Sequence, residues 1–219
     1  MKRTISGKQL MSIKPDLITL DDGWDQCLGD IPRHCVICVW GQSGNGKTGA
    51  MMSLAKALTR YGKVLYNSCE EEFGYSMQNN VRIAGLHEVG KRFQITVDTL
   101  DELTERLEKP RSPEFVFVDS VQAMGLKKSQ VKEFCSRFRN KMLVFISWAD
   151  GNMPKGKVAQ DLKFDANIKI WVSGFKAFSH GRFYGETGEK VIWEEGARRA
   201  YGRDKKEAEN GKEEDRQDS

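Results

Sequence analysis

"GQSGNGKT", residues 41–48, is the stretch of sequence that decides the fold. It matches the pattern G-x-x-x-x-G-K-[ST] at its four fixed positions, Gly41, Gly46, Lys47 and Thr48. A loop of this kind needs a buried strand before it and a helix after it. Here "CVICVW" (35–40) precedes the loop and "GAMMSLAKALTRYG" (49–62) follows it. The sequence therefore predicts a phosphate-binding loop at a strand-to-helix bend.

The expected ligands of this loop are ATP and Mg²⁺. Glycines let the backbone turn its N–H groups toward an anion, and the helix that follows presents its positive end to the same anion. Lys47 would lie between the β- and γ-phosphates, and the Thr48 hydroxyl would ligate Mg²⁺. The predicted nucleotide-binding residues are Gly41, Gln42, Ser43, Gly44, Asn45, Gly46, Lys47, Thr48 and Gly49. The alternative is a glycine turn with an incidental lysine.

A second metal-site residue is expected at the end of a neighbouring strand. "EFVFVDS" (114–120) gives four apolar residues followed by Asp119. A carboxylate there lies at the carboxyl edge of a parallel sheet, where such folds bind ligands. We therefore predict that Asp119 supports the Mg²⁺ ion, although an Asp at this point can also simply cap a helix.

Hydrolysis requires a group that orients or deprotonates water. "VLYNSCEEEFG" (64–74) ends an apolar strand with three glutamates. Glu70, the first of them, is the predicted catalytic base, and Glu71 is the second choice. Acidic residues also favour the first turn of a helix, so part of the triplet can serve only that purpose.

Apolar, strand-like runs alternate with helix-like segments, which predicts an α/β fold with a mostly parallel central sheet flanked by helices. After residue 167, alternating residues and glycines predict a C-terminal region of β-hairpins. Residues 1–15 are interpreted as an N-terminal arm, 16–202 as one domain and 203–219 as a disordered charged tail. Strands are expected at 36–40, 63–67, 93–97, 115–119 and 142–148, and helices at 47–61, 72–84, 100–108 and 130–139.

The net charge and the cysteines do not by themselves identify a partner or a metal site. The net charge is +4, and the 203–219 tail holds five basic and seven acidic residues, so the rest of the chain carries +6. That balance permits an anionic partner without requiring one. Cys35 and Cys38 form a C-x-x-C pair, but no second pair or His cluster completes a zinc site, so core thiols are expected. The polar N-terminus lacks a secretory signal, so a cytoplasmic protein is expected.

With the loop, Asp119 and Glu70 placed, residues 20–185 resemble the RecA-like P-loop NTPases, in particular the ATPase core of bacterial RadA/Sms. "VLYNSCEE" is similar to that family's strand with a catalytic glutamate, and "FVFVDSVQAM" is similar to its D-S-[IV]-Q stretch. "GRFYG" resembles its K-N-R-F-G motif, which puts Arg182 at the catalytic arginine and His180 at the lysine. The resemblance implies an ATP hydrolase that acts as a homo-oligomer, a ring or filament, in DNA recombination, repair or replication.

Some positions depart from that family. Trp148 lies where the family has a polar sensor of the γ-phosphate, so Ser147 or Asp150 would have to substitute. His180 in place of lysine weakens the expected contact between subunits, for which Lys176 is another candidate. Neither a zinc ribbon before the core nor a protease-like domain after it is present in the sequence.

The family's two DNA-binding loops correspond to "QAMGLKKSQ" (122–130) and "DGNMPKGKVAQDLK" (150–163). Their lysines, which suit contacts to the phosphates of single-stranded DNA, are Lys127, Lys128, Lys155, Lys157 and Lys163. Ordinary surface charge is the alternative. Two other functions stay open: a nucleotide-gated assembly or regulatory protein with little hydrolysis and no DNA binding, and a small-molecule kinase with a lid between 150 and 164.

Overall fold

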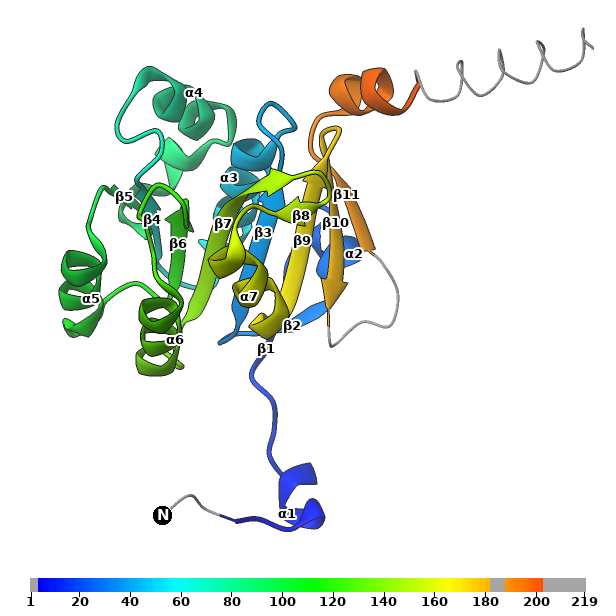
Figure 1. Cartoon of the computed structure of the whole chain (residues 1–219). Helices are drawn as coiled ribbons and strands as arrows, with labels where there is room; N and C mark the ends of the chain where they lie inside the picture. Colours follow the sequence, from blue (N-terminus) through cyan, green and yellow to red (C-terminus); the bar gives the residue numbers. More distant parts are fainter. Residues whose placement is uncertain (1–3, 182–187, 203–219) are drawn as a thin grey trace, which may run out of the picture.

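A nine-stranded sheet runs through the molecule, as Figure 1 shows. The computed structural model describes residues 4–181 and 188–202. The strands lie in the order β11-β10-β9-β3-β7-β6-β4-β5, and β8 pairs with the outer part of β7. Strands β3, β4, β5, β6, β7 and β9 are parallel, whereas β8, β10 and β11 run antiparallel to their neighbours. The strands are β3 (Val36–Gly41), β4 (Val64–Ser68), β5 (Phe93–Thr96), β6 (Phe115–Asp119), β7 (Met142–Asp150), β8 (Met153–Pro154), β9 (Ile168–Ser173), β10 (Lys176–Gly181) and β11 (Gly188–Val191).

Helices cover both faces of the sheet. One face packs against α2 (Trp24–Leu28), α3 (Lys47–Leu58), α4 (Tyr75–Ile83) and the 3₁₀ helix η1 (Leu86–Arg92). The other packs against α5 (Leu100–Glu108), α6 (Lys128–Arg137) and α7 (Lys157–Asp165). Every residue of β4 and β6 is buried, because helices cover both faces of these strands. Each strand begins with consecutive apolar residues, as such strands do, and ends in buried polar ones. A further helix, over 194–202, follows β11.

The N-terminal segment forms a small β-α-β unit that packs against one face of the sheet. Strands β1 (Leu17–Thr19) and β2 (Asp30–Pro32) form an antiparallel pair around α2. Trp24 of α2 is fully buried and its indole N–H donates to Ser53 Oγ of α3 at 3.0 Å. Before this pair, α1 (Gly7–Met11) buries no residue and projects away from the body in Figure 1.

The predicted fold class and the nine predicted elements are confirmed, with ends shifted by a few residues. One expectation was wrong. Residues 150–164 do not form an open loop, because they contain β8 and most of α7. Only Val158, Ala159 and Leu162 of α7 pack on the sheet, and Phe164 is 79% exposed, so the apolar pattern is too short to predict a helix. The helix over 194–202 was not predicted either. The predicted tail, 203–219, lies outside the described residues.

The C-x-x-C pair contains two core thiols, as the sequence predicted. Cys35 packs into the cluster on the α3 face, whereas Cys38 packs into the cluster on the opposite face. The two side chains therefore diverge across the sheet. Burial raises the pKa of each thiol to about 12, which keeps both protonated and unreactive. Within the described chain, no helix has both the length and the apolar character that crossing a bilayer requires.

Candidate active site

The predicted phosphate-binding loop connects β3 to α3, and two of its glycines cannot be replaced without strain. A Cβ atom on Gly41 would lie 2.3 Å from the carbonyl oxygen of Val172 on β9. Gly46 has a φ of +91°, and a Cβ atom there would lie 3.0 Å from the Phe175 ring. The fixed glycines of the motif therefore reflect close approach of β9 and the turn after it.

The turn between β9 and β10 holds the loop in place. The Asn45 side-chain oxygen accepts a hydrogen bond from the Gly174 N–H at 2.8 Å, and the Asn45 carbonyl accepts one from the Phe175 N–H at 3.1 Å. The Phe175 ring in turn packs edge-on against Trp193, with 4.9 Å between ring centroids. The sequence offered no signal for these contacts, because they join segments about 130 residues apart.

A cavity of about 330 Å³ brings the predicted site residues together. Its lining comes from the loop and α3, from the segment after β4, from α4, from the end of β6, from β7 and from the β9–β10 turn. The lining residues are Ser43, Gly44, Gly46, Lys47, Thr48, Gly49, Glu70, Glu71, Ser76, Asn80, Asp119, Ile146 and Phe175. The structure thus gathers the loop, the predicted base and the predicted metal ligands into one cavity.

Lys47 is a half-buried cation that faces three carboxylates. Burial lowers the pKa of its ammonium group, and the negative charges of Glu70, Asp119 and Glu71 oppose that shift. Its Nζ donates to the carbonyl oxygen of Gln42 at 3.3 Å. An ammonium group with one weak neutral acceptor gains strongly from a bound anion.

Asp119 ends β6 and is only 5% exposed. Burial raises its pKa from 3.8 to about 6, opposed by the hydrogen bond that the Tyr66 hydroxyl donates to Oδ2 at 2.5 Å. The charges of Glu70 and Glu71 raise the pKa further, and Lys47 lowers it. The Asp119 carbonyl accepts from the N–H groups of Cys69 (2.7 Å) and Glu70 (3.1 Å), which ties the glutamate segment to the metal-site strand.

Asp119→Asn is expected to stabilise the metal-free, nucleotide-free protein at pH 8 by about 1–3 kcal/mol. The pKa of Asp119 is about 6 in the folded protein and 3.8 in the unfolded chain. The folded state therefore keeps its full stability at pH values below 3.8, where Asp119 is protonated in both states, and loses part of it as the pH rises through about 6. The advantage of the variant should therefore vanish near pH 4. Urea unfolding at pH 4, 6 and 8 measures the difference, and an advantage that does not change with pH would contradict a buried, ionised Asp119.

Oxygen donors gather around Thr48 in a way that suits Mg²⁺. The Thr48 hydroxyl donates to Glu71 Oε1 at 3.3 Å, and Asn80 Nδ2 donates to Glu71 Oε2 at 3.4 Å. Ser68, which is opposite Asp119 in the β4–β6 register, has a buried hydroxyl without a hydrogen-bond partner in the described chain. Among the described residues no group of three or more His, Cys, Asp or Glu could hold a metal alone, so the phosphates would have to supply ligands. Thr48 and Asp119 thus fit a metal that arrives with a nucleotide.

Trp148, at the expected sensor position, contacts the predicted base. Its indole N–H donates to Glu70 Oε2 at 2.6 Å. Lys155 Nζ lies over the Trp148 ring, 5.6 Å from its centroid. Ser147 is buried and accepts a hydrogen bond from Gln122 Nε2 at 2.9 Å. The sequence does not predict this contact with Glu70, because it depends on where β7 lies relative to β4.

Some predicted residues of the described chain do not line this cavity. Arg182 lies outside the described residues. His180 is paired with Lys169 near the start of β9, at the opposite end of that strand from the loop. Lys176 is near the loop end of β10, where it forms an ion pair with Glu189 at 3.2 Å. Asp150 is exposed on the outer part of β7 and does not line the cavity.

The fold and this site define a P-loop ATPase. Residues 37–167 match the family described as "ATPase family associated with various cellular activities (AAA)". Since this match covers more than half of the chain, the protein belongs to that family and is an ATP hydrolase. A comparison with curated protein sequences gives no significant match.

Two solved structures share the fold. One is the flagellar accessory protein FlaH from Methanocaldococcus jannaschii, with a TM-score of 0.56 and 16% identity, covering 77% of this chain and 88% of that protein. The other is a KaiC-like protein from the hyperthermophilic archaeon Pyrococcus horikoshii, with a TM-score of 0.56 and 15% identity, covering 82% of this chain and 92% of that protein. Both likenesses support the RecA-like arrangement of the sheet.

Proposed function

We propose that this protein is a Mg²⁺-dependent, RecA-type ATPase that acts on DNA as a homo-oligomer and is most similar in its motifs to RadA/Sms. The observation that carries the catalytic part is the cavity in which Lys47, Thr48, Glu70 and Asp119 meet. The D-S-V-Q stretch that begins at Asp119 supports the RadA/Sms assignment.

In this proposal each residue has a separate task. The loop amides and Lys47 bind the triphosphate, and Thr48 and Asp119 hold the metal. When bound, Mg²⁺ neutralises charge on the phosphate oxygens. Glu70 accepts a proton from the attacking water, because it is the exposed carboxylate of the cavity that Trp148 already orients. Glu71 is occupied by Thr48 and Asn80, which suits a supporting role.

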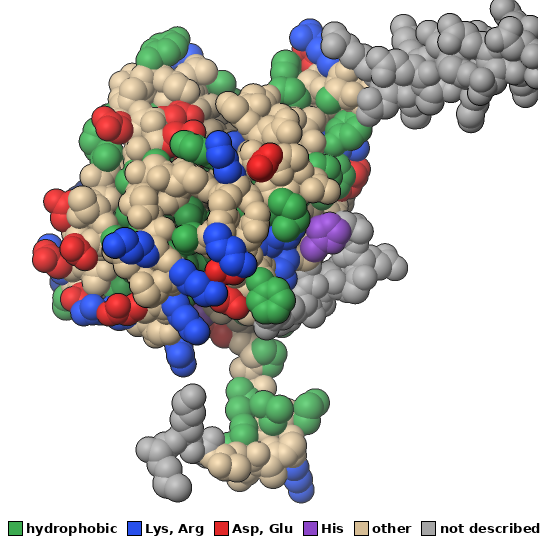
Figure 2. Space-filling view, viewed as in Figure 1, with side chains coloured by type: hydrophobic (Ala, Val, Ile, Leu, Met, Phe, Trp, Pro, Cys, Tyr) green, Lys and Arg blue, Asp and Glu red, His purple; other side chains and the backbone are tan. Residues whose placement is uncertain are grey.

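The DNA part rests on a lysine-bearing face. Figure 2 shows Lys and Arg side chains gathered on the face that α6 and α7 cover. Lys128 and Lys157 share the carboxylate of Asp161, at 2.9 and 3.1 Å. Lys127 and Lys155 are exposed and have no ion pair within the described chain, so they are the residues best placed to contact phosphates.

The test is ATP turnover measured with and without single-stranded DNA on protein whose oligomeric state has been sized. We expect DNA to raise turnover and the variant Lys127→Ala/Lys155→Ala to reduce this stimulation. The slope of log K for DNA binding against log salt concentration should become shallower by about two in this variant, one for each lysine removed. Lys91→Ala, an exposed lysine of η1, is the matched control. DNA-independent turnover by a monomer would exclude the DNA and oligomer parts of the proposal while leaving the ATPase itself intact.

One observation favours the second candidate, a nucleotide-gated assembly protein with little hydrolysis. The hydrogen bond from Trp148 occupies one oxygen of the proposed base, which leaves fewer acceptor sites for the attacking water.

Trp148→Phe is therefore expected to raise DNA-independent turnover by roughly tenfold, since hydrogen bonds to charged groups contribute about 1.5–3 kcal/mol. Steady-state ATPase assays on the variant and on Trp171→Phe, an aromatic control on β9 that does not line the nucleotide cavity, measure this effect. Lower turnover in Trp148→Phe would show that the indole aids Glu70, and unchanged turnover would show that it does not restrain the base.

A further inference from the structure

A second cavity, of about 620 Å³, lies at the opposite edge of the sheet from the nucleotide site. Arg33 and His34 precede β3, Glu114 precedes β6, and Lys141 precedes β7. The nucleotide loop instead follows the carboxyl end of β3. Because these strands are parallel, the two cavities lie at opposite ends of the sheet, and they share no lining residue.

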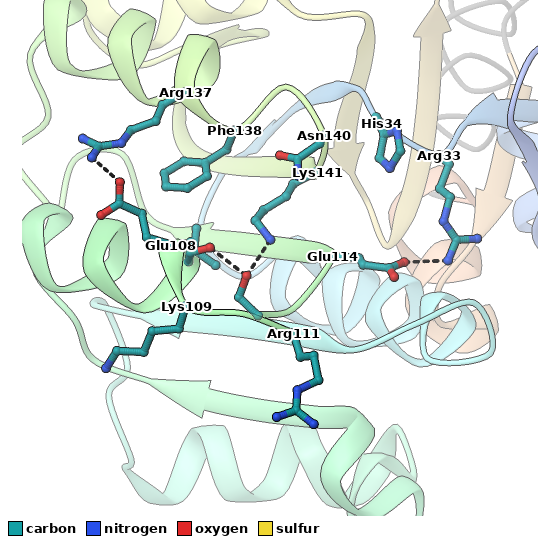
Figure 3. Close-up of a pocket in the computed structure, with 12 residues that line it drawn as sticks. Arg33, His34, Glu108, Lys109, Arg111, Glu114, Arg137, Phe138, Asn140 and Lys141 are labelled. Atoms are coloured by element: carbon teal, nitrogen blue, oxygen red, sulfur yellow. Dashed lines mark hydrogen bonds and ion pairs between the residues drawn. The ribbon is translucent and has the colours of Figure 1, made fainter.

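The lining of this cavity is strongly cationic. Five Lys and Arg residues and two glutamates line it, a balance of +3; the cations are Arg33, Lys109, Arg111, Arg137 and Lys141. Both glutamates are already paired, Glu114 with Arg33 at 2.5 Å and Glu108 with Arg137, as the dashed lines in Figure 3 show. Within the described chain, the other three cations have no carboxylate at ion-pair distance.

Lys141 is the cation that most strongly indicates an anion site, because it is only 7% exposed. Its ammonium group donates to Ser112 Oγ at 2.9 Å, as Figure 3 shows. It also donates to the carbonyl oxygen of Pro113 at 2.9 Å. Both acceptors are neutral, and an ammonium group can donate three hydrogen bonds. Burial lowers the pKa of Lys141, opposed by the charge of Glu114. A buried ammonium without a paired carboxylate is costly, and an anion in the cavity would offset that cost.

The walls add further donors. Lys109 and Arg111 lie on the segment between α5 and β6, and Figure 3 draws them without a hydrogen-bond or ion-pair partner among the lining residues. Asn140 and His34 also line the cavity. The ends of α5 and α6 also lie here, and helix C-termini favour cations. That effect accounts for Arg137, in the last turn of α6, and for Lys109, which caps α5, but not for a buried lysine at the start of β7.

We propose that this cavity binds a small anion that carries two or more phosphate groups. Three unpaired cations within one cavity match a multiply charged ligand better than a single phosphate. The volume lies within the usual range for small-molecule sites, roughly 300–1,000 Å³. Its lining comes from three separate segments of the chain, residues 33–34, 107–114 and 137–141. This anion site is separate from the nucleotide site, so the proposal goes beyond the proposed function and does not depend on it.

Calorimetric titration of the full-length chain with inorganic pyrophosphate tests the proposal. Lys47→Ala removes the nucleotide site, and we expect this variant still to bind one pyrophosphate. Adding Lys109→Ala and Arg111→Ala should weaken that binding at least tenfold, whereas adding Lys132→Ala, an exposed lysine of α6, should change it less than twofold. In the wild-type background, Lys109→Ala/Arg111→Ala should leave basal ATP turnover unchanged.

Lys141→Met serves as a second probe if circular dichroism shows that it folds, and it too should weaken pyrophosphate binding tenfold. Two outcomes would overturn the proposal. One is that Lys47→Ala binds no pyrophosphate, or that it binds pyrophosphate equally well when Lys109 and Arg111 are also replaced. Either result would mean that these cations have only a structural role. The other is that single-stranded DNA displaces pyrophosphate with higher affinity per phosphate, which would assign the cavity to a polymer.

Discussion

Lys47→Ala is expected to reduce ATP turnover by roughly 10²–10³-fold or more, the usual cost of removing one preorganised charge from a developing anion. In the nucleotide-free protein Lys47 has only one weak acceptor, the Gln42 carbonyl, and burial already lowers its pKa. Its positive charge is therefore held at an energetic cost that a triphosphate would offset. Steady-state release of phosphate, followed over the wild-type and variant proteins at saturating ATP, measures the loss.

The fold itself should tolerate this change. No ion pair of Lys47 exists within the described chain, so we expect the free energy of unfolding to stay within about 1 kcal/mol of the wild-type value. Lys132→Ala is a matched control that removes one lysine from an exposed helix surface and should leave turnover unchanged. Normal hydrolysis by a folded Lys47→Ala protein would refute the phosphate-loop assignment.

Much of the fold could be predicted because its signals are local. The loop motif, the continuous apolar runs of β4 and β6 and the apolar spacing of α5 each lie within a dozen residues. Helix α5 also begins with a capping box from Thr99 to Glu102, and its predicted ends were correct. By contrast, α7 buries too few side chains to produce a helical pattern, and its lysines were therefore assigned to a mobile loop.

The site was predictable in its composition but not in its internal contacts. Lys47, Thr48, Glu70 and Asp119 each stand at the end of a strand or the start of a helix, so topology alone brings them to one edge of the sheet. The hydrogen bonds of Asn45 to the β9–β10 turn and of Trp148 to Glu70 join residues about 130 and 78 positions apart. Such contacts depend on the order of the strands and on side-chain rotamers, and patterns in a single sequence predict neither.

Glu70→Gln is expected to reduce ATP turnover by roughly 10²–10⁴-fold, the range for loss of a general base, while ATP binding changes less than threefold. Glutamine keeps the shape of the side chain and one acceptor oxygen, so the indole N–H of Trp148 retains its partner. What is lost is the ability to take a proton from water. Equilibrium binding of ATP and single-turnover hydrolysis, measured on the same preparation, separate the two effects.

Glu71→Gln is the matched comparison, because Glu71 differs from Glu70 in its partners rather than its chemistry. Its two carboxylate oxygens accept from Thr48 and Asn80, so its charge supports the metal-binding hydroxyl. We therefore expect Glu71→Gln to weaken the Mg²⁺ dependence of nucleotide binding and to reduce turnover less than Glu70→Gln does. If Glu71→Gln instead abolishes turnover with binding intact while Glu70→Gln stays active, the base is Glu71. The hydrogen bond from Trp148 would then restrain a carboxylate that takes no part in proton transfer.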